Sequence, residues 1–339
     1  MVLRLLAVIL MASSVQAKVD PFARSIQLDP AFAYYQNRSP ESIAAEVKAE
    51  GYGCVRYAVT CENTINEKLV EAFHKAGIAV WYTTFGNGTY STADFPAGWE
   101  KWRMKLKGKQ AEDAAEGFTY LCMNNPDYRK WRKTQVLKTL KRIPFDGFEI
   151  AEPFWPAFQG PDSPFYGCLC DDCRRLFRAT MPDFDKRNTP VYQKWVDFRV
   201  KSVVSFHQEI IAAVRKSFPN AKIAVWGIAD DIPNPVQTIR EWEGIDGALL
   251  VKTLKPDLFV IQTDWPDWSN PSLPADYPLK YKPFVEAIRS VSKVPIILQA
   301  DIGSFKNCRR GADWMAECEV AAKKAGMIGI TCYEYHLNR

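Results

Sequence analysis

The chain has 339 residues, a formal net charge of +5, and 47% hydrophobic residues. This composition excludes a largely disordered protein. Its basic residues form no stripe with a recognisable reading element, so nucleic acid is not an expected partner. Composition leaves the oligomeric state open.

The first 17 residues, MVLRLLAVILMASSVQA, have the pattern of a signal peptide. One early cation, Arg4, precedes a short apolar run, and small residues follow up to Ala17. The run is much shorter than the roughly 20 residues of a membrane span, and no later stretch is long and apolar enough to be one. We expect cleavage after Ala17 and a secreted or periplasmic protein, with a buried N-terminal strand or helix as the alternative.

Eight short apolar segments recur along the rest of the chain, most of them preceded by an amphipathic stretch. Several are continuous hydrophobic runs, which is typical of strands covered on both faces. They lie at residues 25–29, 54–60, 79–85, 146–152, 222–228, 257–263, 294–301 and 329–334. The intervening helices are predicted at Ser39-Pro40 onward and at residues 67–75, 192–218, 283–291 and 312–325.

Strands that alternate with helices in this way predict a parallel sheet with helices outside it. Eight such units favour a (β/α)₈ TIM barrel, formed as one domain by residues 18–339. An open doubly wound sheet is the main alternative. Such a sheet usually has a glycine-rich phosphate turn after its first strand, where this chain reads Leu28-Asp29-Pro30-Ala31-Phe32.

Two connections are much longer than the others, residues 87–125 after the third strand and residues 153–190 after the fourth. Loops of this length inside a compact domain are usually functional. Both should leave the carboxyl end of the barrel, where barrel enzymes have their active sites.

Four cysteines form a candidate metal site. Cys168, Cys170 and Cys173 lie within six residues, and Cys122 ends the other long connection. Four thiolates match a closed, structural zinc site. Disulfides are the alternative, because an exported protein can form them. The other five cysteines are expected to be mainly buried thiols.

These motifs resemble those of the glycoside hydrolase family 42 β-galactosidases and related hypothetical glycosyl hydrolases. The matching runs are DGFEIAE at 146–152, YGCLCDDCRRLF at 166–177 and CMNNPDYR at 122–129. The resemblance implies a clan A barrel, with zinc bound by the four cysteines near the active site. It also implies that Glu152, at the end of strand four, is the acid/base residue.

The chain departs from the family pattern at three points. Ala151 stands where the clan usually has asparagine, and strand seven ends in Asp301 rather than in the nucleophilic glutamate. The trimerisation and C-terminal domains of the β-galactosidases have no counterpart. Galactosidase activity is therefore not implied.

Glycoside hydrolysis needs two carboxyl groups, one to protonate the leaving oxygen and one to attack the sugar or activate water. We expect Glu152 to be the proton donor, with partial burial raising its pKa. Its expected partner is Asp301, with Glu334 as the alternative. Glu149 is predicted to lie deeper in the barrel in a supporting role.

Further residues at or near strand ends are candidates for sugar binding. Carboxylates and a histidine can bond hydroxyl groups, and aromatic rings can stack on pyranose faces; each aromatic could equally be a core residue. The set is Asp29, Tyr82, Trp155, Trp226, Asp264, Trp265, Tyr333 and His336.

Two other functions compete with an exported glycoside hydrolase. One is a non-catalytic carbohydrate-binding barrel that has lost its nucleophile, which the departures at positions 151 and 301 suggest. The other is a metal-dependent hydrolase. That function needs an open metal site, which a closed four-cysteine set and three scattered histidines do not supply.

Overall fold

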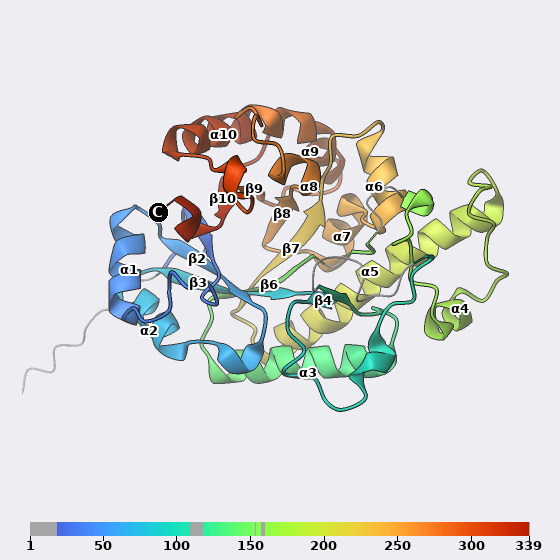
Figure 1. The fold of residues 1–339 in the computed structure, drawn as a ribbon, viewed down its shortest axis with the longest axis horizontal. Coiled ribbons are helices and arrows are strands. Elements are labelled where there is room, and N and C mark those ends of the chain that lie inside the picture. The colour runs from blue at the N-terminus through green and yellow to red at the C-terminus, as the bar shows by residue number, and fades with distance from the viewer. Residues whose placement is uncertain (1–18, 109–117, 153, 157–159, 339) are drawn as a thin grey trace, which may run out of the picture.

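The computed structural model describes residues 19–108, 118–152, 154–156 and 160–338, so the predicted signal peptide lies outside the described residues. Eight parallel strands form one sheet in chain order (Figure 1). They are β1 (Ser25–Leu28), β2 (Cys54–Val59), β3 (Ala79–Phe85), β6 (Gly147–Ala151), β7 (Lys222–Ile228), β8 (Leu258–Gln262), β9 (Ile296–Asp301) and β10 (Gly329–Tyr333). The predicted TIM barrel is confirmed, and the open doubly wound sheet is excluded.

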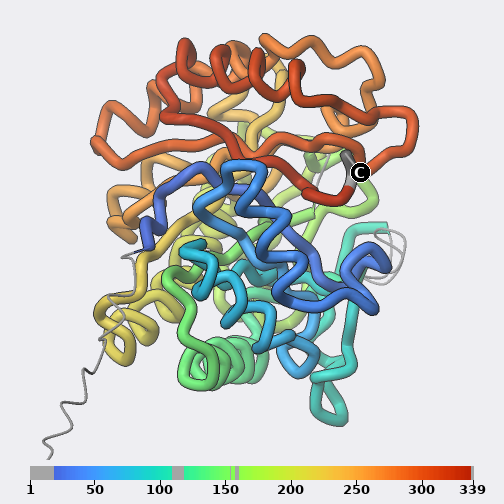
Figure 2. Tube along the Cα trace, turned by 90° about the vertical axis from the view of Figure 1, so that its left-hand side faces the viewer, coloured from blue at the N-terminus to red at the C-terminus, as the bar shows by residue number. Residues whose placement is uncertain are grey.

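The sheet curls until its first and last strands meet. Each strand pairs with the next one in sequence, from Ser25 opposite Cys54 to Tyr333 opposite Asp301. β1 and β10 then lie side by side, and both views show the red C-terminal segment next to the blue N-terminal strands (Figures 1 and 2). Because all eight strands run in the same direction, their carboxyl ends share one mouth.

Helices cover the outside of the barrel, with α3 and α5 next to one another and α9 and α10 on another side (Figure 1). The main helices are α1 (Pro40–Ala49), α2 (Glu67–Lys75), α3 (Pro126–Arg142), α5 (Pro190–Ser217), α6 (Pro235–Glu243), α7 (Gly247–Leu254), α9 (Lys282–Arg289) and α10 (Ala312–Lys324). The Ser39 hydroxyl caps α1 by accepting the Ser42 N–H, as the Ser-Pro pair predicts.

Two apolar layers hold the barrel together. One lies between strands and helices, and the other fills the inside of the barrel with residues such as Trp81, Trp226 and Val260. Inside the barrel, the fully buried Glu149 carboxylate forms an ion pair with Arg56 and accepts a hydrogen bond from Thr83. Glu149 therefore has the supporting position predicted for it.

The two long connections rise from the mouth. The first contains the antiparallel pair β4 (Gly88–Thr89) and β5 (Thr119–Tyr120), and the second contains the short helix α4 (Asp171–Phe177). Another short helix, α8 (Trp265–Trp268), follows β8. Within the described residues, no helix combines the length and apolar character needed to cross a membrane.

Candidate active site at the barrel mouth

Glu152 lies directly after β6 and turns toward the mouth. Strand alternation would point it outward, because Ala151 faces the barrel interior. Its left-handed backbone, with φ of 53°, redirects the side chain. The Gln262 Nε2 then donates a hydrogen bond of 3.0 Å to Glu152 Oε1 across the end of β8.

The surroundings of Glu152 favour its neutral, protonated form. Burial raises the pKa of the carboxyl group to about 7, although the hydrogen bond from Gln262 acts in the opposite direction. A carboxylic acid with this pKa is substantially protonated near neutral pH. It can therefore donate a proton to a substrate oxygen.

A second carboxyl group with a raised pKa, that of Asp264, follows two residues after Gln262. The side chain is buried, and Oδ1 accepts the Trp265 N–H at 2.6 Å. Burial, together with the smaller effects of the charges of Asp230 and Glu152, raises its pKa to about 7. Because Gln262 donates to Glu152 and lies two residues before Asp264, the two carboxyl groups belong to the same part of the mouth.

The Asp301 carboxylate ends β9 and is occupied by the turn that follows. Oδ1 accepts the backbone N–H groups of Gly303 at 2.9 Å and Ser304 at 3.0 Å, and Oδ2 accepts the Ser304 hydroxyl. The Arg310 guanidinium lies 3.6 Å from Oδ1. The side chain lies at the expected strand end, but it is buried and its hydrogen bonds stabilise the turn.

Glu334, the alternative partner, is fully buried behind β1 and β10. Oε1 accepts the Asp29 N–H and the Tyr35 hydroxyl, each at 2.7 Å. Oε2 accepts the His336 backbone N–H at 2.9 Å and also contacts His336 Nδ1. The structure thus brings Asp29, Glu334 and His336 together, but it leaves Glu334 no exposed surface for a substrate.

Two of the predicted sugar-stacking aromatics lie at the mouth. Trp265 is 53% exposed and packs edge-on against Phe305, with ring centroids 4.7 Å apart. Tyr333 ends β10, and burial raises the pKa of its hydroxyl, with smaller contributions from the charges of Asp29 and Glu152.

Three other predicted aromatics are core residues, which corrects the sequence analysis. Tyr82 faces the helices, where its hydroxyl donates to Glu62 at 2.7 Å. Trp155 is fully buried and donates to the Arg199 carbonyl at 3.1 Å. Trp226 lies inside the barrel and donates to Glu149 at 3.0 Å. None of the three has enough exposed surface to stack on a sugar.

Three residues of the mouth were not predicted from the sequence: Gln262, Asp230 and Tyr90. The first two follow apolar strand runs, and a polar residue ending such a run is a usable signal. Tyr90 follows β4 and is 63% exposed, packing edge-on against Phe118. Tyr90 lies inside a long connection, where no strand end or sequence motif marks it as a site residue.

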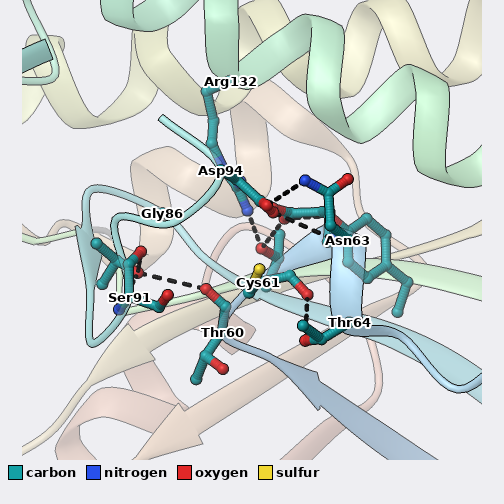
Figure 3. Close-up of polar contacts among 12 residues, drawn as sticks. Thr60, Cys61, Asn63, Thr64, Gly86, Ser91, Asp94 and Arg132 are labelled. Carbon is teal, nitrogen blue, oxygen red and sulfur yellow. Dashed lines mark hydrogen bonds and ion pairs between the residues drawn. The ribbon is translucent and has the colours of Figure 1, made fainter. Parts of the chain in front are cut away.

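Polar contacts anchor the segment that carries Tyr90 (Figure 3). The Thr89 hydroxyl donates to the Ser91 carbonyl at 2.7 Å. The Asp94 carboxylate accepts the Asn63 N–H at 3.1 Å and so joins this segment to the loop after β2. Beneath them, Arg132 forms a buried ion pair of 2.8 Å with Glu62.

The four predicted metal-binding cysteines form one cluster that joins the two long connections. Their sulfur atoms all lie within 4.8 Å of one another, and Cys122 Sγ is 3.5 Å from both Cys170 Sγ and Cys173 Sγ. Tetrahedral zinc with bonds of about 2.3 Å requires sulfur atoms about 3.8 Å apart. A disulfide requires about 2.05 Å. The arrangement therefore fits a metal ion better than disulfides.

The neighbours of the sulfur atoms also suit thiolates. The Lys105 N–H points at Cys168 Sγ at 3.4 Å, and the Asn124 N–H at Cys122 Sγ at 3.4 Å. The Asn124 side-chain amide donates to Cys173 Sγ at 3.3 Å. Such donors stabilise negative charge on sulfur, as partners of metal ligands commonly do.

Solved structures of glycoside hydrolases share this fold. The catalytic domain of β-amylase from Paenibacillus polymyxa matches with a TM-score of 0.59 and 14% identity, over 94% of this chain and 93% of that one. A family 42 β-galactosidase from G. stearothermophilus matches with a TM-score of 0.65 and 14% identity, over 93% of this chain and 51% of that one. The β-galactosidase from Bacillus circulans sp. alkalophilus gives 0.64 and 13%, over 93% and 50%.

These likenesses establish the fold. The expected (β/α)₈ barrel is confirmed as a fold that this chain shares with glycoside hydrolases, and the chain spans about half the length of these β-galactosidases. No protein-family model and no curated protein sequence matches the chain.

Proposed function

We propose that this barrel is a glycoside hydrolase that cleaves an oligo- or polysaccharide, with Glu152 as its proton donor. The observation that carries the proposal is the Glu152 carboxyl group. It stands at the end of the fourth barrel strand, turned into the mouth toward Gln262, and its pKa is raised to about 7. The shared fold of the glycoside hydrolases supports the same conclusion.

In this reaction, Glu152 transfers its proton to the glycosidic oxygen while the bond from that oxygen to the anomeric carbon breaks. A second carboxyl group either attacks the anomeric carbon or removes a proton from the attacking water. In the first case, water later releases the sugar and returns a proton to Glu152. Carboxyl separations of about 5–5.5 Å give retention of configuration, and separations of about 6.5–9.5 Å give inversion.

Asp264 and Asp301 are the two candidates for the second carboxyl group. Asp301 occupies the strand end that the family resemblance indicates. However, both of its oxygens already accept hydrogen bonds from the following turn. Among the described residues, the Asp264 carboxylate accepts a hydrogen bond from the Trp265 N–H, and its charge interacts with that of Glu152. We therefore favour Asp264 over Asp301. Glu334, the alternative expected from the sequence, is fully buried and is the least accessible of the three carboxyl groups.

Trp265 and Tyr90 are suited to hold a sugar chain at the mouth. Both rings are more than half exposed, at 53% and 63%. Each forms a T-shaped contact with a neighbouring phenylalanine, and we expect the exposed part of the ring to stack on a sugar. Asp29, Tyr333 and His336 would contribute hydrogen bonds on the β1 and β10 side.

A panel of aryl glycosides and polysaccharides tests the proposal. Glu152→Gln should reduce kcat by about 10²–10⁴-fold on glycosides with poor leaving groups. The loss should be smaller on dinitrophenyl glycosides, because that leaving group needs little protonation. Asp264→Asn should reduce turnover of both substrate types, and Asp301→Asn and Glu334→Gln are the comparison variants.

Full activity of Glu152→Gln on a poor leaving group would refute its role as the acid. Proton NMR of the first-formed sugar anomer reads the stereochemical outcome. If Asp301→Asn loses turnover on both substrates while Asp264→Asn retains it, Asp301 is the partner instead.

The second candidate function is a carbohydrate-binding barrel without catalysis. It is favoured by the engagement of Asp301 and Glu334 in hydrogen bonds, which leaves the usual nucleophile position without a free carboxylate. Calorimetry with oligosaccharides that the protein binds but does not hydrolyse would support this function.

The four-cysteine cluster is proposed to hold a structural zinc ion, bound by Cys122, Cys168, Cys170 and Cys173. Zinc would supply a rigid link between the two long connections and no open position for substrate. Export through the first 17 residues is likewise a proposal. Fusing these residues to a reporter and locating the reporter outside the cytoplasm tests it.

A further inference from the structure

A cavity of about 600 Å³ opens beside the mouth, at the carboxyl ends of β1 and β2. One wall is the loop after β1, with Asp29 and Asn37, and the other is the loop after β2, with Thr60 and Asn66. Ile43 of α1 and Leu69 of α2 also line it. Its volume lies within the ~300–1,000 Å³ that is common for small-molecule sites.

The polar groups of the cavity suit an uncharged, hydroxyl-rich ligand. Asp29 Oδ1 accepts the Ala31 N–H at 3.0 Å, which fixes the carboxyl group at the cavity wall. Asn66 Oδ1 caps α2 by accepting the Leu69 N–H at 3.2 Å, so the orientation of its amide is also fixed. The one cation of the lining, Arg38, is paired with Glu46 and therefore does not select an anion.

The apolar part of the lining suits the same ligand class. Pro30 and Ala31 after β1, and Ala58 near the end of β2, are partly exposed and give the cavity an apolar surface next to its amide and carboxyl groups. A pyranose presents both kinds of surface, with C–H groups on its faces and hydroxyl groups around its edge. An anionic ligand would meet the Asp29 carboxyl group, which disfavours it.

Asp29 connects this cavity with the mouth. Its backbone N–H donates to Glu334, and the end of β10 brings Tyr333 close to it. Tyr333 in turn lies within electrostatic range of Glu152. Asp29 and Glu152 both follow barrel strands at the carboxyl rim, so we expect a sugar chain held at Glu152 to continue past Tyr333 and Asp29 into the cavity.

We propose that the cavity between the loops after β1 and β2 is a subsite for an uncharged pyranose unit, remote from the bond that is cleaved. This inference rests on the proposed carbohydrate substrate but not on hydrolysis itself. The affinity for an oligosaccharide should therefore increase with chain length until the ligand is long enough for one unit to occupy the cavity.

The test measures binding by calorimetry, with neutral gluco-, galacto- and xylo-oligosaccharides and with uronic-acid oligosaccharides, each of one to six units. Thr60→Trp fills the cavity, and Asp29→Asn removes the charge while keeping the acceptor for the Ala31 N–H. Thr134→Trp, on an exposed position of α3, is the matched control. Thermal unfolding of each variant verifies folding.

Wild type and Thr134→Trp should gain affinity with chain length. Thr60→Trp should lose at least tenfold in affinity for the longest ligands and little for the shortest, and Asp29→Asn should show a smaller loss of the same kind. Equal losses at all lengths, no loss in either variant, preference for uronic-acid oligosaccharides, or no binding by wild type would overturn the inference.

Hydrolysis assays on the same proteins separate this inference from the proposed function. Length-dependent binding that Thr60→Trp abolishes, in a protein without hydrolytic activity, would support the subsite and refute the hydrolase. If hydrolysis depends on Glu152 but Thr60→Trp binds oligosaccharides of every length normally, the hydrolase is supported and the subsite is refuted.

Discussion

At the residue scale, the environments of three carboxyl groups set them apart. Glu152 has a raised pKa, and Gln262 donates a hydrogen bond to its side chain. Glu149, only three residues earlier, is neutralised by Arg56 inside the barrel. Asp301 is held by its own turn. Residue type is the same or nearly the same in each case, so burial and hydrogen-bond partners decide which group is available for proton transfer.

The raised pKa of Glu152 predicts a pH-dependent cost to folding. In the unfolded chain, Glu152 should have the ordinary pKa of 4.5, whereas in the folded protein its pKa is about 7. As pH rises, the unfolded chain therefore loses this proton before the folded protein does. Stability should therefore fall as pH rises between these values. Glu152→Gln should match wild type near pH 4 and be more stable at pH 8 by about 1–3 kcal/mol.

Urea unfolding at the two pH values measures this difference. Glu286→Gln, at an exposed position of α9, is the control and should show no such pH-dependent gain. An equal effect of Glu152→Gln at pH 4 and pH 8 would show that the carboxyl group is not held in its neutral form.

The buried ion pair of Arg56 and Glu149 predicts a strong asymmetry between single and double variants. Arg56→Met leaves the Glu149 carboxylate buried without its cation and should cost about 3–5 kcal/mol. Arg56→Met combined with Glu149→Leu removes both charges and should recover most of that stability. Denaturant unfolding measures both. If the double variant is as unstable as the single one, the loss of stability comes from lost packing rather than from the unpaired charge.

At the element scale, the two long connections act as one unit at the mouth. The four sulfur atoms bring residue 122 of the first next to residues 168–173 of the second. Asp94 joins the first connection to the loop after β2 through Asn63. These links position the segment with Tyr90 without a helix or a long strand, so rigidity at the rim depends on side-chain contacts.

The proposed zinc site predicts that this rigidity depends on the metal. Wild type should contain about one zinc ion per chain, and Cys170→Ser should lose zinc and melt at a lower temperature. Limited proteolysis should then cut between α4 and α5. Cys308→Ala, a buried thiol outside the cluster, should keep its zinc.

Elemental analysis and thermal unfolding with and without a chelator provide the measurements. Metal-free wild-type protein, with these cysteines in disulfides by mass spectrometry, would contradict the zinc proposal.

At the scale of the whole molecule, closure of the barrel depends on residues that lie 299 and 305 positions apart in the chain. Glu334, after the last strand, accepts hydrogen bonds from the Asp29 backbone after the first strand and from Tyr35. The carboxylate is fully buried with both oxygens in use. It therefore fastens the two ends of the sheet to each other.

This contact predicts that Glu334→Ala destabilises the whole barrel by about 2–4 kcal/mol, because buried donors lose a charged acceptor. Thermal and urea unfolding should both show the loss, whereas Glu286→Ala on the surface should change stability by less than about 0.5 kcal/mol. If Glu334→Ala keeps its stability but loses turnover, Glu334 acts in the reaction rather than in closure.

The sequence by itself determined the barrel and the place of its mouth. Continuous apolar runs alternating with capped helices leave few architectures, and parallel strands must end on one rim. Local spacing also indicated the cysteine cluster, since Cys168, Cys170 and Cys173 lie within one short turn. Position after a strand was enough to select Glu152 as a mouth residue.

Only the tertiary structure decided which mouth residues are available. Tyr82, Trp155 and Trp226 are residue types that can stack on sugars, but in the fold all three are buried. The partners that occupy Glu334 come from the other end of the chain, and those that hold Asp301 come from the fold of its turn. Burial and hydrogen-bond saturation arise from contacts between distant segments, and such contacts leave no periodic signal in the sequence.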